Sequence, residues 1–247
     1  MITLYHAPQS RSSRMIWLLE ELGVPYEIRP VSIFRPMTGE GVGDPANPHP
    51  DKRVPAIEHN GALVAESVAI LQYLTDAFPN AGLGPRIGTP ERGAYLTWLA
   101  WYAAEMEPAM FAAMLGELVG APRKQRSYDA VVARLERALA DGPYVMGDDF
   151  SGADLLIGSA LAFARHAFPP SAAIDAYIAR CQARPAAERA GPLDDASGIQ
   201  IVMGEGERET ELADIDIDRR RDVRDIKLRL CRDDRGAGKT VDHRILS

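Results

Sequence analysis

The stretch MITLYHAPQSRSSRMIWLLEELGVPYEIRPV, residues 1–31, decides the fold class of the first part of the chain. Residues 2–5 form a short apolar run that is typical of a buried strand. Apolar residues then recur at helical spacing over residues 15–22, and Gly23 stands where a helix end favours a left-handed residue. Residues 26–31 indicate a second strand. A strand, a helix and a strand in this order predict a βαβ unit with parallel strands and a right-handed crossover.

The residues that follow complete a small α/β domain. Residues 34–53 are rich in proline and glycine and predict a loop. The pair Asn60-Gly61 lies between two apolar runs, which is a strong hairpin signal because both residues tolerate positive φ. A helical pattern over residues 67–78 ends before a proline. We therefore predict a βαβ unit followed by a ββα unit, with a mixed sheet, over residues 1–80.

The chain changes character after this domain. Residues 81–89 predict a linker, and residues 90–190 predict an all-helical domain because they contain no strand candidate. Thr89 is a good N-cap for the first helix of that domain. Pro108 is expected to kink or divide the helical segment that follows.

The C-terminal part is expected to end its regular structure early. The last helix is predicted over about residues 173–183 from its apolar spacing. Residues 191–247 carry many charges of both signs and no aromatic residue, which predicts a mostly disordered tail. An alternating stretch at 226–230 leaves a short strand open as an alternative.

The composition excludes several function classes. The chain has 28 basic and 35 acidic residues and a net charge of −7, which argues against nucleic acid and anionic membrane surfaces as partners. Its two cysteines, Cys181 and Cys231, form neither a disulfide framework nor a metal motif, and the histidines lack metal-ligand spacing. Cys181 is expected to be a buried apolar residue. The N-terminal residues do not have the pattern of a signal peptide, so we expect a cytoplasmic protein. The lack of metal-ligand spacing leads us to expect no metal.

Ser10, Arg11 and Ser12 form the first candidate site, at the start of the first predicted helix. Unpaired N–H groups and the positive end of the helix dipole favour an anion or a thiolate there. A serine hydroxyl can donate a hydrogen bond to that anion. The alternative is that Ser10 or Ser12 only caps the helix. No His/Asp pair is placed by spacing, so a serine hydrolase is unsupported.

Two further pairs are candidate ligand contacts. A cis bond at Val54-Pro55 would expose the backbone N–H and C=O of Val54 to a ligand, whereas the alternative is an ordinary strand start. Ser67 is expected to be the N-cap of a helix, and its hydroxyl and N–H would hold a ligand carboxylate. Glu66 would then bind an ammonium group of the same ligand. The alternative for this pair is one more capped helix.

Five pieces of sequence carry a resemblance to the glutathione transferase family, and they occur in the family's order. The resemblance implies an α/β thioredoxin-like N-terminal domain plus an all-α C-terminal domain, and it covers everything except the tail. The matching pieces are Leu4-Tyr5 with a serine-bearing loop and Arg14, LLEELG at 18–23, VPAI at 54–57, ESVAIL at 66–71, and the helix-capping pair Ser151-x-x-Asp154.

The resemblance implies a role for each candidate residue. Val54-Pro55 matches the cis-proline whose preceding residue pairs with the cysteinyl backbone of glutathione, and Glu66 and Ser67 match the pair that holds the γ-glutamyl end. The hydroxyl that stabilises the glutathione thiolate is expected from Ser10 first, Ser12 second and Tyr5 third.

Basic residues complete the glutathione site that the resemblance implies. Arg11 falls near the catalytic cysteine position of another bacterial class, so a cysteine-type mechanism is excluded, and Arg11 is assigned to glutathione binding. Lys52 and Arg53 are assigned to the glycine carboxylate. The segment before Val54 carries extra residues relative to the family's Asn-Pro-x-Gly-Lys pattern.

The implied function is a glutathione transferase that stabilises the thiolate of its co-substrate glutathione for attack on a small hydrophobic electrophile. A glutathione-dependent isomerase or dehalogenase, or a non-catalytic ligand-binding or interaction protein, remains the alternative. The resemblance also implies a homodimer. The helical domain is expected to supply the apolar wall for the electrophile, and most of its candidate side chains are expected to be ordinary core. The candidates are Trp101, Tyr102, Met106, Met110 and Phe111.

Overall fold

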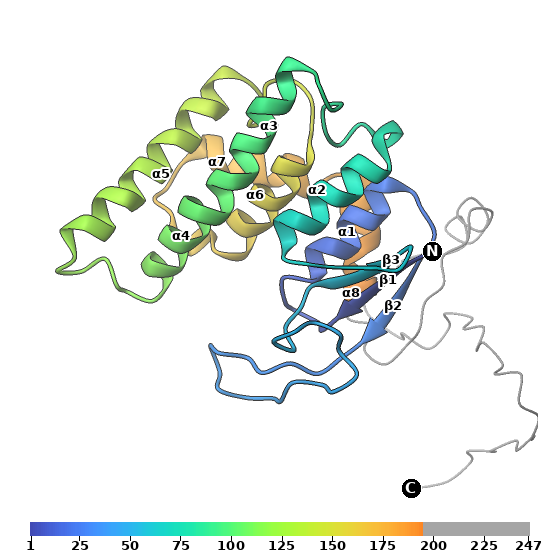
Figure 1. The fold of residues 1–247 in the computed structure, drawn as a ribbon. Coiled ribbons are helices and arrows are strands. Elements are labelled where there is room, and N and C mark those ends of the chain that lie inside the picture. The colour runs from blue at the N-terminus through green and yellow to red at the C-terminus, as the bar shows by residue number, and fades with distance from the viewer. Residues whose placement is uncertain (195–247) are drawn as a thin grey trace, which may run out of the picture.

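Four short strands form the mixed sheet predicted for the N-terminal part (Figure 1). The structure, a computed structural model, describes residues 1–194. The strand order is β2-β1-β3-β4; β1 runs parallel to β2 and antiparallel to β3, and β3 is antiparallel to β4. Asn60 and Gly61, with φ of 50° and 80°, form the predicted hairpin turn. The strands are β1 (Ile2–His6), β2 (Tyr26–Pro30), β3 (Ala56–His59) and β4 (Ala62–Ala65).

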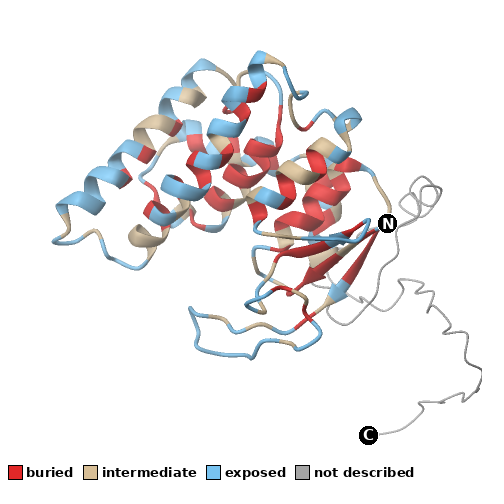
Figure 2. Cartoon of the chain, viewed as in Figure 1, coloured by how far each residue is buried: buried red, intermediate tan, exposed pale blue. Residues whose placement is uncertain are grey.

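Helices α1 (Ser13–Leu22) and α2 (Ser67–Ala77) lie together on one face of this sheet (Figure 1). Their apolar sides join the main core, and Figure 2 shows that α1 is buried over most of its length. Gly23 ends α1 in the expected left-handed conformation, with φ of 66°. A small separate cluster of Tyr5, Val31 and Ala56 lies apart from this core.

The rest of the described chain is helical, as expected. Between residue 90 and residue 194 the structure has no strand, only an isolated bridge between Tyr144 and Gly147. The elements are η1 (Pro79–Ala81), α3 (Pro90–Trp101), η2 (Tyr102–Met106), α4 (Glu107–Met114), α5 (Pro122–Asp141), α6 (Gly152–Phe163), η3 (Arg165–Ala167), α7 (Ala172–Gln182) and α8 (Pro185–Asp194).

The division expected at Pro108 takes the form of a π-helical turn, η2, between α3 and α4. Proline lacks an N–H, and its ring clashes with the carbonyl four residues earlier, so the α-helical ladder cannot continue through it. The N–H of Glu107 instead donates to the carbonyl of Tyr102, five residues back. This turn sets the direction of the Tyr102 and Glu107 side chains, which meet in the site described below.

Helix α6 forms the centre of the helical part. Ser151 and Asp154 make the expected capping box, in which Asp154 Oδ2 accepts from the Ser151 N–H at 2.9 Å and from its hydroxyl at 2.8 Å. Cys181 of α7 packs against Gly158 of α6, and burial raises the pKa of its thiol to about 12. The expectation that Cys181 is a buried apolar residue is therefore confirmed.

Helix α8 is absent from the sequence-based prediction, which ended the last helix near residue 183. The helix packs along α1 and is joined to it by the ion pair of Arg189 with the buried Glu20 at 2.6 Å. Arg184, just before α8, makes a second ion pair to α1 with Glu21 at 2.6 Å. Such long-range charge pairs leave no local periodicity in the sequence, which explains the omission. The predicted tail at 191–247 overlaps the end of α8, and residues 195–247 lie outside the described residues.

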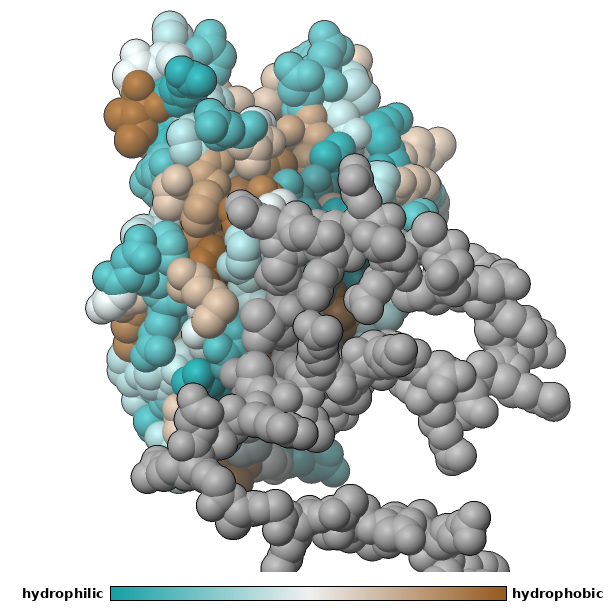
Figure 3. All heavy atoms as spheres, turned by 90° about the vertical axis from the view of Figure 1, so that its right-hand side faces the viewer, coloured by the Kyte–Doolittle hydropathy of each residue, from teal (hydrophilic) through white to brown (hydrophobic). Residues whose placement is uncertain are grey.

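The surface drawn in Figure 3 shows hydrophobic residues gathered in a band between hydrophilic ones. Over residues 1–194, no helix has both the length and the apolar character that crossing a bilayer requires.

The ion pair between α8 and α1 generates a stability prediction. Replacing Arg189 by Met should lower the free energy of unfolding by about 3 kcal/mol, because it removes the charged partner of a buried carboxylate. Among the described residues, the remaining side-chain donor to Glu20 is the Tyr26 hydroxyl at 2.8 Å. Urea unfolding followed by circular dichroism measures this loss. Lys124→Met is the control, since its pair with Glu117 is solvent-exposed and should contribute less than about 1 kcal/mol. Equal losses in the two variants would contradict the view that the Arg189–Glu20 ion pair stabilises the packing of α8 on α1.

Candidate functional site

The loop between β1 and α1 presents two serine hydroxyls of different accessibility. Ser12 is fully buried, and its Oγ contacts His6 Nδ1 at 2.9 Å and the Ala7 N–H at 3.2 Å. Ser10 is half-buried; its Oγ lies 2.8 Å from Ser12 Oγ and accepts the Ser12 N–H at 3.1 Å. Ser12 is the N-cap residue of α1 by position, but its side chain makes no capping hydrogen bond. The more accessible hydroxyl of the pair is therefore that of Ser10.

Tyr5 is held away from this pair by its own partners. Its hydroxyl donates to Glu58 Oε2 at 3.0 Å and accepts from Arg29 Nη1 at 3.2 Å. Burial, and then the hydrogen bond to Glu58, raise the pKa of Tyr5. The ring belongs to the small cluster with Val31 and Ala56. The described contacts do not bring Tyr5 together with Ser10 and Ser12.

Arg14 ties the starts of α1 and α2 to the helical domain. Its Nη2 donates to Ser67 Oγ at 2.9 Å, and its Nη1 donates to the Tyr102 hydroxyl. Glu107 Oε1 accepts from the Tyr102 hydroxyl at 2.7 Å, from Arg11 Nε at 3.1 Å and from Arg14 Nη2 at 3.4 Å. One carboxylate of α4 thus holds two cations of the first helix and its preceding loop. The sequence analysis counts Arg14 among the residues that resemble the glutathione transferase family, but it predicts no role for Arg14.

The charges in this network are set by burial and by the two arginines. Burial alone would raise the pKa of Glu107, but the hydrogen bond from Arg11 and the charge of Arg14 outweigh it, so the pKa is lowered. Burial raises the pKa of Tyr102 to about 12 despite the nearby Arg14. At neutral pH Glu107 is therefore ionised and Tyr102 is a neutral donor.

Glu66 and Ser67 lie where β4 passes into α2, and here one expectation is wrong. Ser67 is the first residue of α2 rather than its N-cap, which is Glu66, and the Ser67 hydroxyl is engaged by Arg14. Glu66 has φ of 70° and ψ of 127°, an unfavourable conformation for a residue with a side chain. Its side chain is 72% exposed, and no side chain caps the N–H groups of α2 in the described part of the chain.

The segment before β3 contains the expected cis peptide bond between Val54 and Pro55. Lys52 does not point free into solvent: its Nζ donates to the carbonyls of Asn47 at 2.7 Å and Pro45 at 3.3 Å, so it closes its own loop. This contact argues against its assignment to the glycine carboxylate of glutathione.

Arg53 is 62% exposed, and Nη2 lies 2.8 Å from Asp51 Oδ2 and 3.6 Å from Glu66 Oε1. Its guanidinium therefore already has two acidic neighbours. The expected contact to the glycine carboxylate stays a prediction.

Most of the side chains predicted to line the electrophile pocket belong to the hydrophobic core. Trp101, Tyr102, Met106 and Met110 are all at most 5% exposed, so the alternative of ordinary core side chains holds for these four. Phe111 is partly exposed, and the guanidinium of Arg11 lies 5.2 Å from its ring centroid. Sequence periodicity identified the helix but not which of its faces was buried.

Among residues 1–194, no group of three or more histidine, cysteine, aspartate or glutamate side chains could hold a metal ion.

Comparisons with known proteins agree with this architecture. The family model for the glutathione S-transferase N-terminal domain matches residues 4–85, and that for the C-terminal domain matches residues 100–187. Glutathione S-transferase 3 of Schizosaccharomyces pombe is 30% identical over 118 residues, which are 48% of each chain. The maleylacetoacetate isomerase of Rattus norvegicus is 27% identical over 146 residues, 57% of this chain and 67% of that protein. The chain thus spans about half the length of the first of these relatives.

Solved structures match over a larger share of the chain. A glutathione transferase from Methylococcus capsulatus strain Bath is 30% identical, with a TM-score of 0.64, over 78% of this chain and 98% of that one. A sphingomonad glutathione S-transferase complexed with glutathione is 25% identical, with a TM-score of 0.64, over 79% of this chain and 100% of that one. Both domain models match in the order and at the positions of the two structural parts. The chain belongs to the glutathione S-transferase family.

Proposed function

We propose that this protein is a glutathione transferase in which Ser10 stabilises the thiolate of glutathione for attack on a small hydrophobic electrophile. The observation that carries the proposal is the meeting of the N-termini of α1 and α2, which Arg14 links by its hydrogen bond to Ser67. Helix N-termini favour anions because their N–H groups are unpaired and the helix dipole is positive there. Two of the three anionic groups of glutathione are assigned to these helix starts, its γ-glutamyl carboxylate and its thiolate.

The thiol end belongs at the start of α1. The free thiol is mostly protonated at neutral pH, and the thiolate is the nucleophile. A hydroxyl donor and a helix N-terminus stabilise the charged form and thereby lower its pKa. Ser10 suits this role better than Ser12, because Ser12 is fully buried while Ser10 is half-buried. Tyr5 is the least suitable of the three, since Glu58 and Arg29 already occupy its hydroxyl.

The γ-glutamyl end belongs at the start of α2. The uncapped N–H groups of α2 would hold the carboxylate, and the exposed Glu66 carboxylate would pair with the ammonium group. The unfavourable φ of Glu66 fits a residue that is held for ligand binding. Val54 would pair through its backbone with the cysteinyl unit of the tripeptide.

The electrophile would lie beside the sulfur, against Phe111 of α4. Arg11 joins α4 to the thiol site through Glu107 and stacks on the same ring. Proximity to the thiolate then supplies much of the rate enhancement. The relationship to an isomerase keeps glutathione-dependent isomerisation as the second candidate, since the same thiolate would add to a double bond.

The homodimer implied by the family and the cytoplasmic location expected from the N-terminal sequence are part of this proposal. Sedimentation at several protein concentrations tests the dimer, and a monomer at all concentrations would contradict it.

Replacing Ser10 by Ala should lower kcat/KM toward an activated aryl halide by about 100-fold, because one donor to the developing charge is lost. The Kd of glutathione should change far less, since the hydroxyl acts on the ionised sulfur. Steady-state kinetics and calorimetric titration measure the two effects. Ser159→Ala, another half-buried serine that is hydrogen-bonded within α6, is the matched control. A Ser10→Ala enzyme with unchanged rate would remove Ser10 from the mechanism.

Replacing Glu66 by Gln should weaken glutathione binding about tenfold, which corresponds to about 1.4 kcal/mol, because the ammonium group loses its charged partner. The value of kcat at saturating glutathione should stay close to that of the wild type. Calorimetric titration measures Kd, with Glu136→Gln on the exposed side of α5 as the control. Identical Kd values for the wild type and Glu66→Gln would place the γ-glutamyl end elsewhere.

A further inference from the structure

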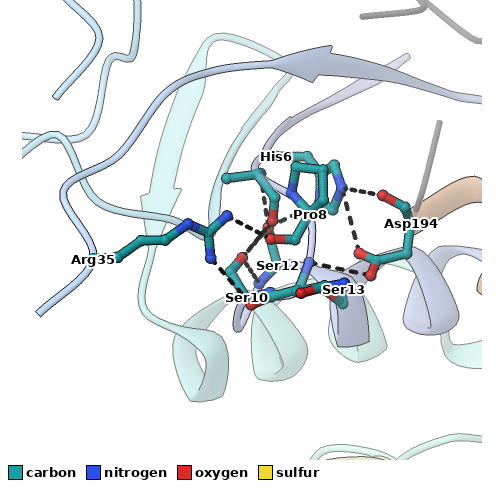
Figure 4. A network of polar contacts seen from close by, with 9 residues as sticks. His6, Pro8, Ser10, Ser12, Ser13, Arg35 and Asp194 are labelled. Atoms are coloured by element: carbon teal, nitrogen blue, oxygen red, sulfur yellow. Dashed lines mark hydrogen bonds and ion pairs between the residues drawn. The ribbon is translucent and has the colours of Figure 1, made fainter. Parts of the chain in front are cut away.

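A continuous row of polar groups leads from Ser10 into the protein and ends on α8, the last helix of the described residues (Figure 4). Ser10 Oγ lies 2.8 Å from Ser12 Oγ, and Ser12 Oγ lies 2.9 Å from Nδ1 of His6. The other ring nitrogen, Nε2, lies 3.3 Å from the backbone oxygen of Asp194 and 3.4 Å from its Oδ1. Segments almost two hundred residues apart thus build one hydrogen-bonded row.

The partners of His6 determine the direction of this row. Both Asp194 oxygens can only accept, so the ring proton is on Nε2 and Nδ1 is an acceptor. Nδ1 therefore accepts the hydroxyl proton of Ser12. Ser12 Oγ, which also accepts the Ala7 N–H at 3.2 Å, is left with a lone pair for the hydroxyl proton of Ser10.

The Ala7 carbonyl competes for these protons. It lies 2.7 Å from Ser10 Oγ and 3.2 Å from Ser12 Oγ. The longer contact is to Ser12, whose proton is needed at Nδ1 because no other donor to Nδ1 occurs among the described contacts of His6. The Ser10 hydroxyl therefore has two acceptors within hydrogen-bond distance, the Ala7 carbonyl and Ser12 Oγ.

The environment of His6 keeps the ring neutral before a ligand binds. The residue is 1% exposed, and burial lowers its pKa, while the hydrogen bond and the charge of Asp194 oppose this shift only in part. Asp194 of α8 faces the ring, and Arg35 approaches the adjoining loop through the carbonyls of Pro8 and Gln9. A neutral imidazole whose Nδ1 is unprotonated is a competent proton acceptor.

We propose that His6 receives the thiol proton of glutathione through Ser10 and Ser12, with Asp194 holding the ring. This inference rests on the proposed function, which places the glutathione sulfur beside Ser10. The S–H bond breaks and its proton passes to Ser10 Oγ; the Ser10 proton passes to Ser12 Oγ, and the Ser12 proton passes to His6 Nδ1. The products are a thiolate that accepts a hydrogen bond from Ser10 and an imidazolium beside the Asp194 carboxylate.

The step balances in charge and in protons. The thiolate and the imidazolium form together, so each stabilises the other across the two hydroxyls, and Asp194 adds a second negative partner. His6 does not touch the substrate, so it is a positioning residue: it sets the direction of the hydroxyl row and holds the proton at its far end. Through Asp194, helix α8 thereby contributes to the deprotonation of the thiol.

The test compares the glutathione thiolate in the wild type, His6→Asn and Asp194→Asn. An asparagine at position 6 can still hydrogen-bond to Ser12 but cannot take a proton. The ultraviolet thiolate band of bound glutathione is followed against pH. We expect about tenfold less thiolate in His6→Asn at pH values below the thiol pKa, and about threefold less in Asp194→Asn. Glutathione affinity at a pH where the thiol is protonated should be unchanged in both variants.

Proton counting provides a readout that a merely structural role would not alter. Calorimetry in two buffers of different ionisation enthalpy should show that the wild type releases fewer protons per thiolate formed than His6→Asn. His59→Asn is the matched control, because His59 is also buried in the sheet but bonds to Tyr73, away from the serines. Thermal melting checks the folding of each variant.

The outcomes separate this inference from the proposed function. A wild-type thiolate band that His6→Asn and Asp194→Asn leave unchanged, with equal proton release, would overturn the role of His6 while the proposed function stands. If His6→Asn does not fold, an unchanged thiolate band in Asp194→Asn is sufficient to overturn the role of His6. A wild type that binds glutathione without a thiolate band overturns both.

Discussion

The arrangement of the two structural parts depends on the hydrogen bonds and the ion pair of the buried Arg14 guanidinium. An arginine that is 8% exposed needs partners for its charge, because an unpaired buried charge is strongly destabilising. The two terminal nitrogens of Arg14 find these partners in three different elements, Ser67 of α2, Tyr102 of η2 and Glu107 of α4, whereas its Nε has no hydrogen-bond partner among the described residues. The relative position of the α/β sheet and the helical domain is therefore set at the place where the proposed site forms.

The π-helical turn between α3 and α4 supplies two of these partners. Pro108 forces a departure from α-helical geometry, and the five-residue step aims the Tyr102 hydroxyl at Glu107. Glu107 then stays ionised between Arg11 and Arg14. The π-helical turn would weaken an isolated helix, but here it precedes the carboxylate of Glu107, which joins α4 to the start of α1.

The start of α1 is held from two sides by charged groups that are distant in sequence. On one side Glu107 of α4 binds Arg11 and Arg14, and on the other side Asp194 of α8 binds the His6 ring and the N–H of Gln9. Loops alone rarely hold reacting groups in one geometry, whereas loops clamped by helices can do so. The serine pair lies between these two clamps.

The sequence by itself determined the strand–helix–strand unit, the hairpin at Asn60-Gly61 and the capping box of Ser151 and Asp154. These features follow from the spacing of apolar residues and from turn and cap residues, which act over a few positions and need no distant partner. The positions of the serine-bearing loop, Val54-Pro55 and Glu66 also came from local sequence pattern.

Only the tertiary structure decided which of these residues have partners, and where. It placed four of the five predicted wall residues in the core, engaged Lys52 with its own loop and turned Tyr5 toward Glu58. His6 had no metal spacing and no nearby acid in sequence, and α8 showed no distinct pattern, yet the two meet through Asp194. The reason is physical: burial and ion pairing between distant segments depend on how helices pack in three dimensions, and that packing has no period along the chain.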